Sequence, residues 1–158
     1  ISAETRKRYE SVLVLHESNL PKGRGWSPLA WQILEGKSEV TVTMLEASDV
    51  IDGGVILAQE VVAFEGHELN DEINRKVLDA KFRLMNLAVD GSCLPTEQSG
   101  EPTYYRRRTP DDSRLDPEKS IAEQFDLLRI CEPRFPVFFE LRGCHYEMSI
   151  KKVSHVVA

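Results

Sequence analysis

Closely spaced cysteines and an excess of basic residues are both missing from this 158-residue sequence. Its three cysteines, Cys93, Cys131 and Cys144, lie far apart, so no pair has the spacing of a metal or redox site. We therefore expect free thiols in a reducing compartment and no metal site. Lys and Arg number 20 against 26 Asp and Glu, a net charge of −6, which excludes a uniformly basic nucleic-acid-binding protein.

Long hydrophobic runs are also missing. The longest apolar runs, such as residues 12–15, are far shorter than the ~20 residues that a membrane span needs. The chain does not open on a basic, then apolar, then small-residue leader. We therefore expect a cytoplasmic protein that does not contact a membrane.

The hydrophobic pattern predicts an α/β protein. Residues 12–15 form an uninterrupted apolar run between polar flanks, which is typical of a strand buried on both faces of a parallel sheet. Residues 28–35 predict a short helix, because Pro28 suits its first turn and Gly36 its end. Residues 40–45 and 55–64 are rich in β-formers and predict two further strands.

The second half of the chain predicts a long helix and then a small separate unit. Apolar residues recur at steps of three or four from Leu69 to Leu87, which predicts a helix that Gly91 ends. A further helix is predicted to open at Asp116 and Pro117, with one apolar face formed by Ile121, Phe125 and Leu128. Residues 137–141 and 144–150 predict a hairpin that turns at Arg142-Gly143. We accordingly expect an α+β module over residues 101–158.

Two residues are candidates for acid–base chemistry. His16 follows the strand predicted at 12–15, at the edge of the sheet where ligands of open α/β proteins bind, and an imidazole exchanges protons near neutral pH. The alternative is a histidine that only caps the strand. Asp52 lies in a glycine-flanked loop from which its carboxylate could hold the imidazole, although Asp-Gly-Gly is also a good turn.

The most unusual segment is LPKGRGWSP at residues 20–28. Its two prolines and two glycines fix a backbone that side chains do not obstruct, and a predicted helix begins directly after it. The segment is therefore either a close wall for a ligand or a rigid crossover loop.

Several motifs carry a family resemblance. In order and spacing, HESNLPKGRG (16–25), SP (27–28), WQILEG (31–36), VT (42–43) and DGGVI (52–56) closely resemble the folate-dependent formyltransferases. Arg114-Leu115-Asp116 and the strand at 136–141 resemble the start of the C-terminal domain in the methionyl-tRNA branch. The resemblance spans roughly residues 9–153, which makes coincidence a poor explanation.

The resemblance implies a partial Rossmann-like formyltransferase core, a mixed sheet with flanking helices. Residues 1–100 would be the C-terminal part of the catalytic domain, followed by the module at 101–158. Because family members begin with further βα units that supply much of the folate pocket, we expect this chain to lack that N-terminal part.

The activity implied by the resemblance is transfer of a formyl group from the co-substrate 10-formyltetrahydrofolate to a primary amine. His16 and Asp52 match the family's proton-moving pair. Folate contacts are expected from Ser18, Leu20, Pro21, Gly25 and Asp52. Substrate contacts are expected from Lys22, Arg24, Trp26, Tyr105 and Arg106.

One departure concerns the formyl oxygen. The family has an Asn two residues before the His, where this chain has Val14, and an apolar side chain cannot donate that hydrogen bond. A backbone N–H, Asn19 or a segment absent from this chain would have to replace it, or activity is low.

The acceptor is a separate question, because fold and donor do not fix it. The net charge of −6 disfavours tRNA as the acceptor. The motifs HES (16–18) and GWSP (25–28) resemble the sugar-modifying members more than the tRNA enzyme, so we expect a nucleotide-linked amino sugar. The run Tyr104–Arg108 could contact a pyrophosphate and a base, or it could be a solvated loop paired with nearby carboxylates. Alternatives are a methionyl-tRNA formyltransferase and a non-catalytic binding or dimerisation module; a homodimer is possible in either case.

Overall fold

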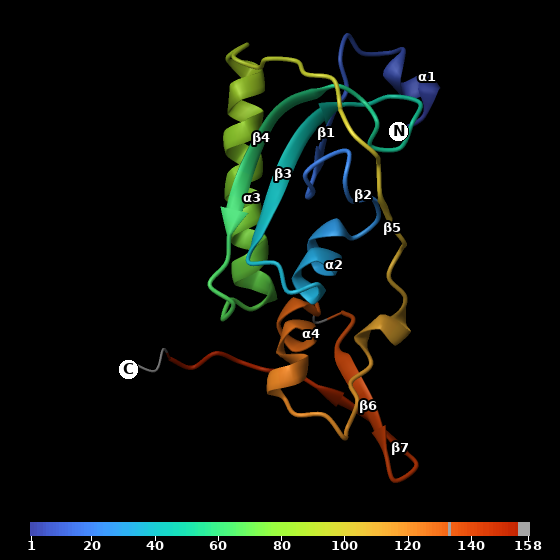
Figure 1. Cartoon of the computed structure of the whole chain (residues 1–158), viewed down its shortest axis with the longest axis vertical. Helices are drawn as coiled ribbons and strands as arrows, with labels where there is room; N and C mark the ends of the chain where they lie inside the picture. The colour runs from blue at the N-terminus through green and yellow to red at the C-terminus, as the bar shows by residue number, and fades with distance from the viewer. Residues whose placement is uncertain (133, 155–158) are drawn as a thin grey trace.

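A small antiparallel sheet forms the centre of the chain. A computed structural model, which describes residues 1–132 and 134–154, places β1 (Leu13–His16), β3 (Glu39–Glu46) and β4 (Ile56–Ala63) in the order β1-β3-β4. The helix α3 (Asn70–Val89) covers one face of this sheet, and α1 (Ala3–Arg6) precedes it in the chain (Figure 1). The mixed α/β class expected from the sequence is confirmed, as are the two predicted strands β3 and β4.

The setting expected for residues 12–15 is wrong. Among the strands that residues 1–132 and 134–154 form, β1 pairs with β3 alone and runs antiparallel to it, so it is an edge strand of this antiparallel sheet. Leu13 is 40% exposed, and Val14 and Leu15 are half-buried. A short apolar run has the same sequence pattern at a sheet edge as at its centre, which is why the pattern misled.

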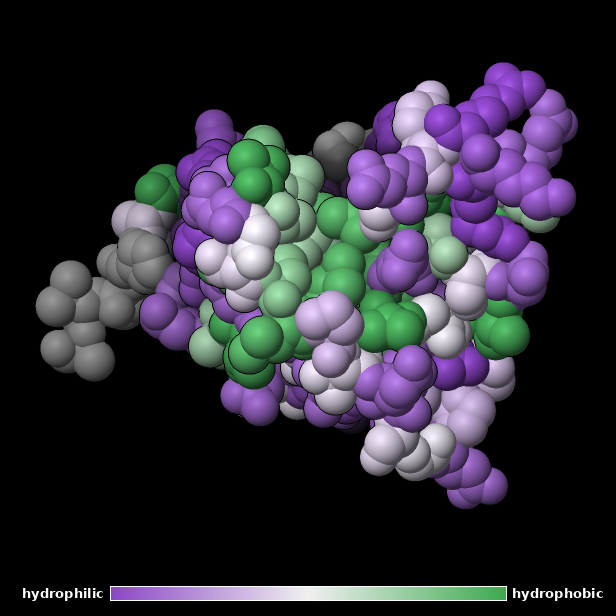
Figure 2. Space-filling model, turned by 90° about the horizontal axis from the view of Figure 1, so that it is seen from above, coloured by the Kyte–Doolittle hydropathy of each residue, from purple (hydrophilic) through white to green (hydrophobic). Residues whose placement is uncertain are grey.

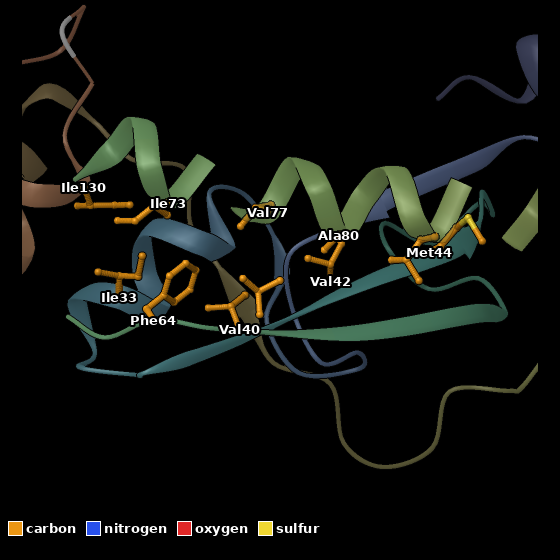
Figure 3. Packing of buried hydrophobic residues seen from close by; sticks show 11 residues of the cluster. Ile33, Val40, Val42, Met44, Phe64, Ile73, Val77, Ala80 and Ile130 are labelled. Atoms are coloured by element: carbon orange, nitrogen blue, oxygen red, sulfur yellow. The ribbon is translucent and has the colours of Figure 1, made fainter. Parts of the chain in front are cut away.

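The main core lies between the sheet and α3 (Figure 3). Alternate residues of β3 point toward the helix: Val40, Val42 and Met44 are all buried. They pack against the predicted apolar stripe of α3, which consists of Ile73, Val77, Ala80 and Leu84. Each fully buried Val, Leu, Ile or Met side chain contributes about 1.5–3 kcal/mol, so this packing fixes the sheet that carries the site.

The opposite face of β3 supports the site. Thr43 lies between Val42 and Met44 and therefore points away from α3. His16 pairs with Thr43 across the two strands, which puts both side chains on this face. Thr43 Oγ1 donates a hydrogen bond to the Ser18 carbonyl at 2.6 Å and so holds the chain that follows β1 against the sheet.

Two segments far apart in sequence meet beside that face. The strand β2 (Arg24–Gly25) pairs in parallel with β5 (Tyr104–Tyr105), and α2 (Pro28–Leu34) follows β2 as predicted. Glycine is required at position 25, where φ is +99° and where a Cβ would lie 2.5 Å from the Tyr105 carbonyl oxygen. The loop at 20–28 is thereby tied to the segment that leads into the C-terminal module.

The C-terminal module has a second, smaller core around Leu115, Leu128 and Val137. It contains the 3₁₀ turns η1 (Pro110–Ser113) and η2 (Ala122–Gln124), the helix α4 (Phe125–Ile130) and the hairpin of β6 (Val137–Leu141) and β7 (Cys144–Met148). The hairpin turns at Arg142-Gly143, both with positive φ, as predicted.

The helix expected to open at Asp116 begins later than the pattern indicated. Residues 117–119 form a turn and a bend in place of the expected first helical turn, and Ile121, expected on the apolar face, is 64% exposed. The cause is Gln124, whose amide donates to the carbonyls of Asp116, Lys119 and Ser120 and accepts from the Asp116 N–H. These bonds satisfy the backbone in a non-helical form.

Hydrophobic side chains gather on the end of the molecule where α3 ends, within a hydrophilic border (Figure 2). α3 also carries a second apolar stripe that remains exposed: Leu78, Phe82, Met85 and Val89. None of the helices formed by residues 1–132 and 134–154 combines the length and hydrophobicity of a membrane span.

Candidate functional site

His16 stands at the end of β1 and contacts the loop at 20–28. Its ring is only 6% exposed, and its Nε2 donates a hydrogen bond to the Gly23 carbonyl at 2.8 Å. A carbonyl oxygen only accepts, so Nε2 carries a proton. The other nitrogen, Nδ1, lies 3.6 Å from Asp52 Oδ2, a separation longer than a hydrogen bond.

Asp52 reaches the imidazole from the turn before β4. The residue has a positive φ of 50°, which aspartate tolerates better than most residues. Its Oδ2 accepts the Gly25 N–H at 2.8 Å and also faces His16. The structure therefore brings together the two residues expected to be catalytic, although they are 36 positions apart in the sequence.

A clamp behind Asp52 holds its turn in place. Gln98 Nε2 donates to the carbonyls of Asp52 and Gly54, each at 2.8 Å. Gln98 Oε1 accepts from Arg24 Nη2 at 2.6 Å. Because Arg24 lies between Gly23, which contacts His16, and Gly25, which contacts Asp52, Gln98 links both sides of the pair. We define Gln98 and Arg24 as the clamp.

Arg24 is consequently buried in the protein, although we expected it to contact substrate. Its Nη1 approaches the Tyr104 hydroxyl at 3.4 Å, and its Nε has no partner among the described residues. Its contacts all hold the loop in position. A direct role for Arg24 in binding substrate thus stays a prediction that this geometry does not favour.

The loop at 20–28 also packs against the Tyr105 ring at Gly23. A Cβ on Gly23, which has φ +73°, would lie 2.9 Å from the Tyr105 ring. The Tyr105 hydroxyl donates to Glu35 Oε2 at 2.8 Å. Burial and this bond to a carboxylate raise the pKa of the Tyr105 phenol well above its usual range, so the hydroxyl remains a proton donor.

Arg106 is engaged within the protein as well. Its guanidinium pairs with Asp112, with one hydrogen bond of 2.8 Å, and lies over the Trp31 ring with Cζ 4.6 Å from the centroid. Hydrogen bonding from Arg106 lowers the pKa of the Asp112 carboxyl well below its usual range. Lys22 and Trp26, by contrast, are exposed beside the loop. The expected substrate contacts therefore split into inward and outward groups.

Three of the five residues expected to contact folate lie at the start of the loop or just before it. Ser18 is fully buried, and its Oγ has no hydrogen-bond partner among the described residues. Leu20 and Pro21 are buried apolar residues joined by a cis peptide bond. An unsatisfied hydroxyl beside apolar residues suits a ligand that combines rings with polar edges, and contact of Ser18, Leu20 and Pro21 with folate stays a prediction.

Val14 offers no substitute for the missing Asn. It is half-buried within β1 opposite Leu45 and has no donor. The amide of Asn19 accepts from Gln59 Nε2 at 3.2 Å through its Oδ1, which leaves its NH₂ group for another acceptor. Within residues 1–132 and 134–154 no three side chains of the metal-ligating types are grouped as an ion would require.

Comparison with known proteins identifies the family. Residues 1–89, more than half of the chain, match the Formyl transferase family model. The chain belongs to the formyl transferase family. Members of this family are one-carbon transferases that use 10-formyltetrahydrofolate, so the recognised family, the enzyme class and the expected co-substrate are confirmed at family level.

Solved structures confirm the fold over nearly the whole chain. Methionyl-tRNA formyltransferase from Clostridium thermocellum is 23% identical with a TM-score of 0.83, covering 98% of this chain and 68% of that one. A sugar N-formyltransferase from Shewanella sp FDAARGOS_354 is 18% identical with a TM-score of 0.72, covering 94% and 63%. HypX from Aquifex aeolicus in complex with tetrahydrofolic acid is 19% identical with a TM-score of 0.73, covering 94% and 27%.

The residues that sequence reasoning missed form the support of the site. Gln98 lies in an irregular segment without periodicity or motif, so no signal in a single sequence marked it. Thr43 stood within the VT motif, but its role depends on which face of β3 it occupies. Both act through the backbone of the loops, which a side-chain pattern does not reveal.

Proposed function

We propose that this protein transfers a formyl group from 10-formyltetrahydrofolate to the primary amine of a nucleotide-linked amino sugar. The observation that carries the proposal is the pairing of His16 with Asp52 beside the stiff loop, with Nδ1 to Oδ2 at 3.6 Å. A lone histidine at a strand end needs no carboxylate behind it, whereas a proton-transferring histidine is commonly held by one.

His16 and Asp52 have distinct roles in this proposal. The bound donor supplies the formyl carbon. An amine attacks the formyl carbon only when neutral and must lose a proton afterwards, while the bond from that carbon to the folate nitrogen breaks. In this proposal His16 accepts the amine proton and returns it to the departing folate nitrogen, which releases tetrahydrofolate. Asp52 fixes the ring and is itself fixed by the Gly25 N–H. Nε2 carries a proton and donates it to the Gly23 carbonyl, so the loop must release this nitrogen, and the proton must move to Nδ1 facing Asp52, before Nε2 accepts a proton from an amine.

Two observations support an amino sugar over tRNA as the acceptor. The net charge of −6 gives little attraction for a polyphosphate backbone. Of the three arginines in the run at 106–108, Arg106 is already paired with Asp112. A small acceptor needs one or two cationic side chains in a cavity, which the remaining arginines supply.

Incubation of the full-length protein with 10-formyltetrahydrofolate and one acceptor at a time tests the proposal. The acceptors are a panel of nucleotide-linked amino sugars and methionyl-tRNA, and release of tetrahydrofolate is followed. We expect turnover with an amino sugar. Turnover with methionyl-tRNA alone would favour the tRNA function, and absence of both turnover and folate binding would favour a non-catalytic module.

A further inference from the structure

A cavity separate from the His16–Asp52 pair lies where the C-terminal module meets the sheet and helices. It has a volume of about 630 Å³, within the range of small-molecule sites. Its walls come from α2, α3, η1 and α4, with α4 contacting both α2 and α3. We call it the junction cavity. None of the residues expected to be catalytic lines it.

Two arginines give the junction cavity a positive charge. Arg107 is exposed, and its side chain has no hydrogen bond or ion pair with the described part of the chain. Arg108 donates to the Asp112 carbonyl at 3.0 Å and to the Ser113 hydroxyl at 3.5 Å, and its Nε has no partner among the described residues. Neither guanidinium meets a carboxylate within residues 1–132 and 134–154, so each retains its full charge for an anion.

The other walls add the features that a nucleotide needs. Glu132 is the one carboxylate among the described lining residues, and Arg134 pairs with it at 3.2 Å. Asn70 and Asn74 also line the cavity, although the Asn70 amide already donates to the Ile130 carbonyl and accepts from Asn74. Phe135 is 59% exposed, with Arg134 Cζ 6.0 Å from its ring centroid, which leaves the opposite ring face for a base. Guanidinium groups suit phosphate oxygens, and aromatic faces suit bases of any identity.

The junction cavity lies within reach of the catalytic pair. Ser27 lines the cavity, and Gly25, two residues earlier, donates its N–H to Asp52. Two residues span at most about 7 Å, which a sugar with its diphosphate exceeds. A ligand with its diphosphate in the cavity can therefore extend its sugar along residues 25–27 toward His16.

We propose that the junction cavity binds the nucleoside diphosphate of the acceptor, with Arg107 and Arg108 on the phosphates and Phe135 on the base. The assignment rests on the proposed function for its biological ligand. The site itself is defined by nucleoside diphosphate chemistry and can be tested without turnover.

Titration calorimetry of the full-length protein with uridine diphosphate, thymidine diphosphate and inorganic diphosphate provides the test. We expect Arg107→Ala to weaken binding of all three at least tenfold, because it removes one charge-assisted contact. Phe135→Ala is expected to weaken binding of the nucleotides but not of inorganic diphosphate. Arg75→Ala, on an exposed position of α3 outside the cavity, is the matched control and should leave all affinities within twofold.

The outcomes distinguish failure of the cavity assignment from failure of the proposed function. Absence of saturable nucleotide binding by the wild type, or affinities unchanged in Arg107→Ala, would overturn the cavity assignment. Formyl transfer to an amino sugar with an unchanged KM in Arg107→Ala would do the same and leave the function standing. Nucleotide binding that depends on Arg107 without any formyl transfer would support the cavity and refute the function. Equal competition by a triglutamate peptide would show a general anion site and contradict the nucleotide assignment.

Discussion

Replacement of Gln98 by alanine tests whether the clamp positions Asp52. The substitution removes two hydrogen bonds to the turn carbonyls and one from Arg24. At about 1 kcal/mol for each net bond, the loss in free energy of unfolding is about 3 kcal/mol, less where water replaces a bond at this half-buried side chain. Without the Gln98 hydrogen bonds, the turn that carries Asp52 should also move, and the distance between Asp52 Oδ2 and His16 Nδ1 should increase.

We also expect Gln98→Ala to lower activity even where the variant is fully folded, so the loss of stability does not account for the effect. A displacement of about 1 Å in a catalytic group costs up to about 100-fold in rate, so we expect kcat/KM to fall about 10- to 100-fold in Gln98→Ala, chiefly through kcat. Both enzymes should be assayed by tetrahydrofolate release under conditions where circular dichroism shows each to be folded. The pH profile of kcat should change as well, because the imidazole loses its fixed partner.

Gln124→Ala is the matched control. Gln124 also ties several backbone groups with one side-chain amide, but it does so in the C-terminal module, away from His16. We expect Gln124→Ala to lose a similar free energy in urea unfolding while kcat/KM stays within twofold. Should Gln98→Ala also keep kcat/KM within twofold of the wild type, the idea that the clamp positions Asp52 is refuted.

Two further predictions concern stability. Burial alone would raise the pKa of Glu68, but hydrogen bonds from Lys76 and the backbone lower it to about 2, so its stabilisation is complete above pH ~4.5 and lost as the pH falls toward 2. The free energy of unfolding in urea should fall by about 3 kcal/mol between pH 4.5 and 2. In Glu68→Gln this fall should be much smaller, and an identical pH dependence in the variant would contradict the prediction. Gly25→Ala and Gly100→Ala share a φ of +99°, but only the first puts a Cβ against the Tyr105 carbonyl. Gly25→Ala should therefore cost at least ~2 kcal/mol more, and equal losses would show that the contact relaxes freely.

The sequence was most informative where one local rule decided the structure. The stripe of α3 and the hairpin turn at Arg142-Gly143 depend on periodicity and on positive φ, both of which are local. β1 and the helix after Asp116 were misjudged for reasons that lie elsewhere in the chain. The antiparallel pairing of β1 with β3 placed β1 at the edge of the described sheet, and the Gln124 side chain bonded backbone groups that a helix would have used.

The candidate site shows the same division. His16 and Asp52 could be proposed because their chemistry and motif positions are visible in the sequence. The inward turn of Arg24 and the role of Gln98 depend on the pairing of β2 with β5, a contact between segments about 80 residues apart that no local pattern encodes. Long-range backbone pairing therefore decided which polar residues face the site and which support it.

The pairing of His16 with Asp52 as one catalytic unit is tested most directly by a double-mutant cycle on formyl transfer. His16→Ala should lower kcat/KM at least ~100-fold, and Asp52→Asn should lower it similarly. Because Asp52 acts through His16, the double variant should be no slower than His16→Ala alone, a strongly non-additive result. Wild-type rates in His16→Ala, or losses that simply multiply in the double variant, would contradict the proposal that these two residues act together.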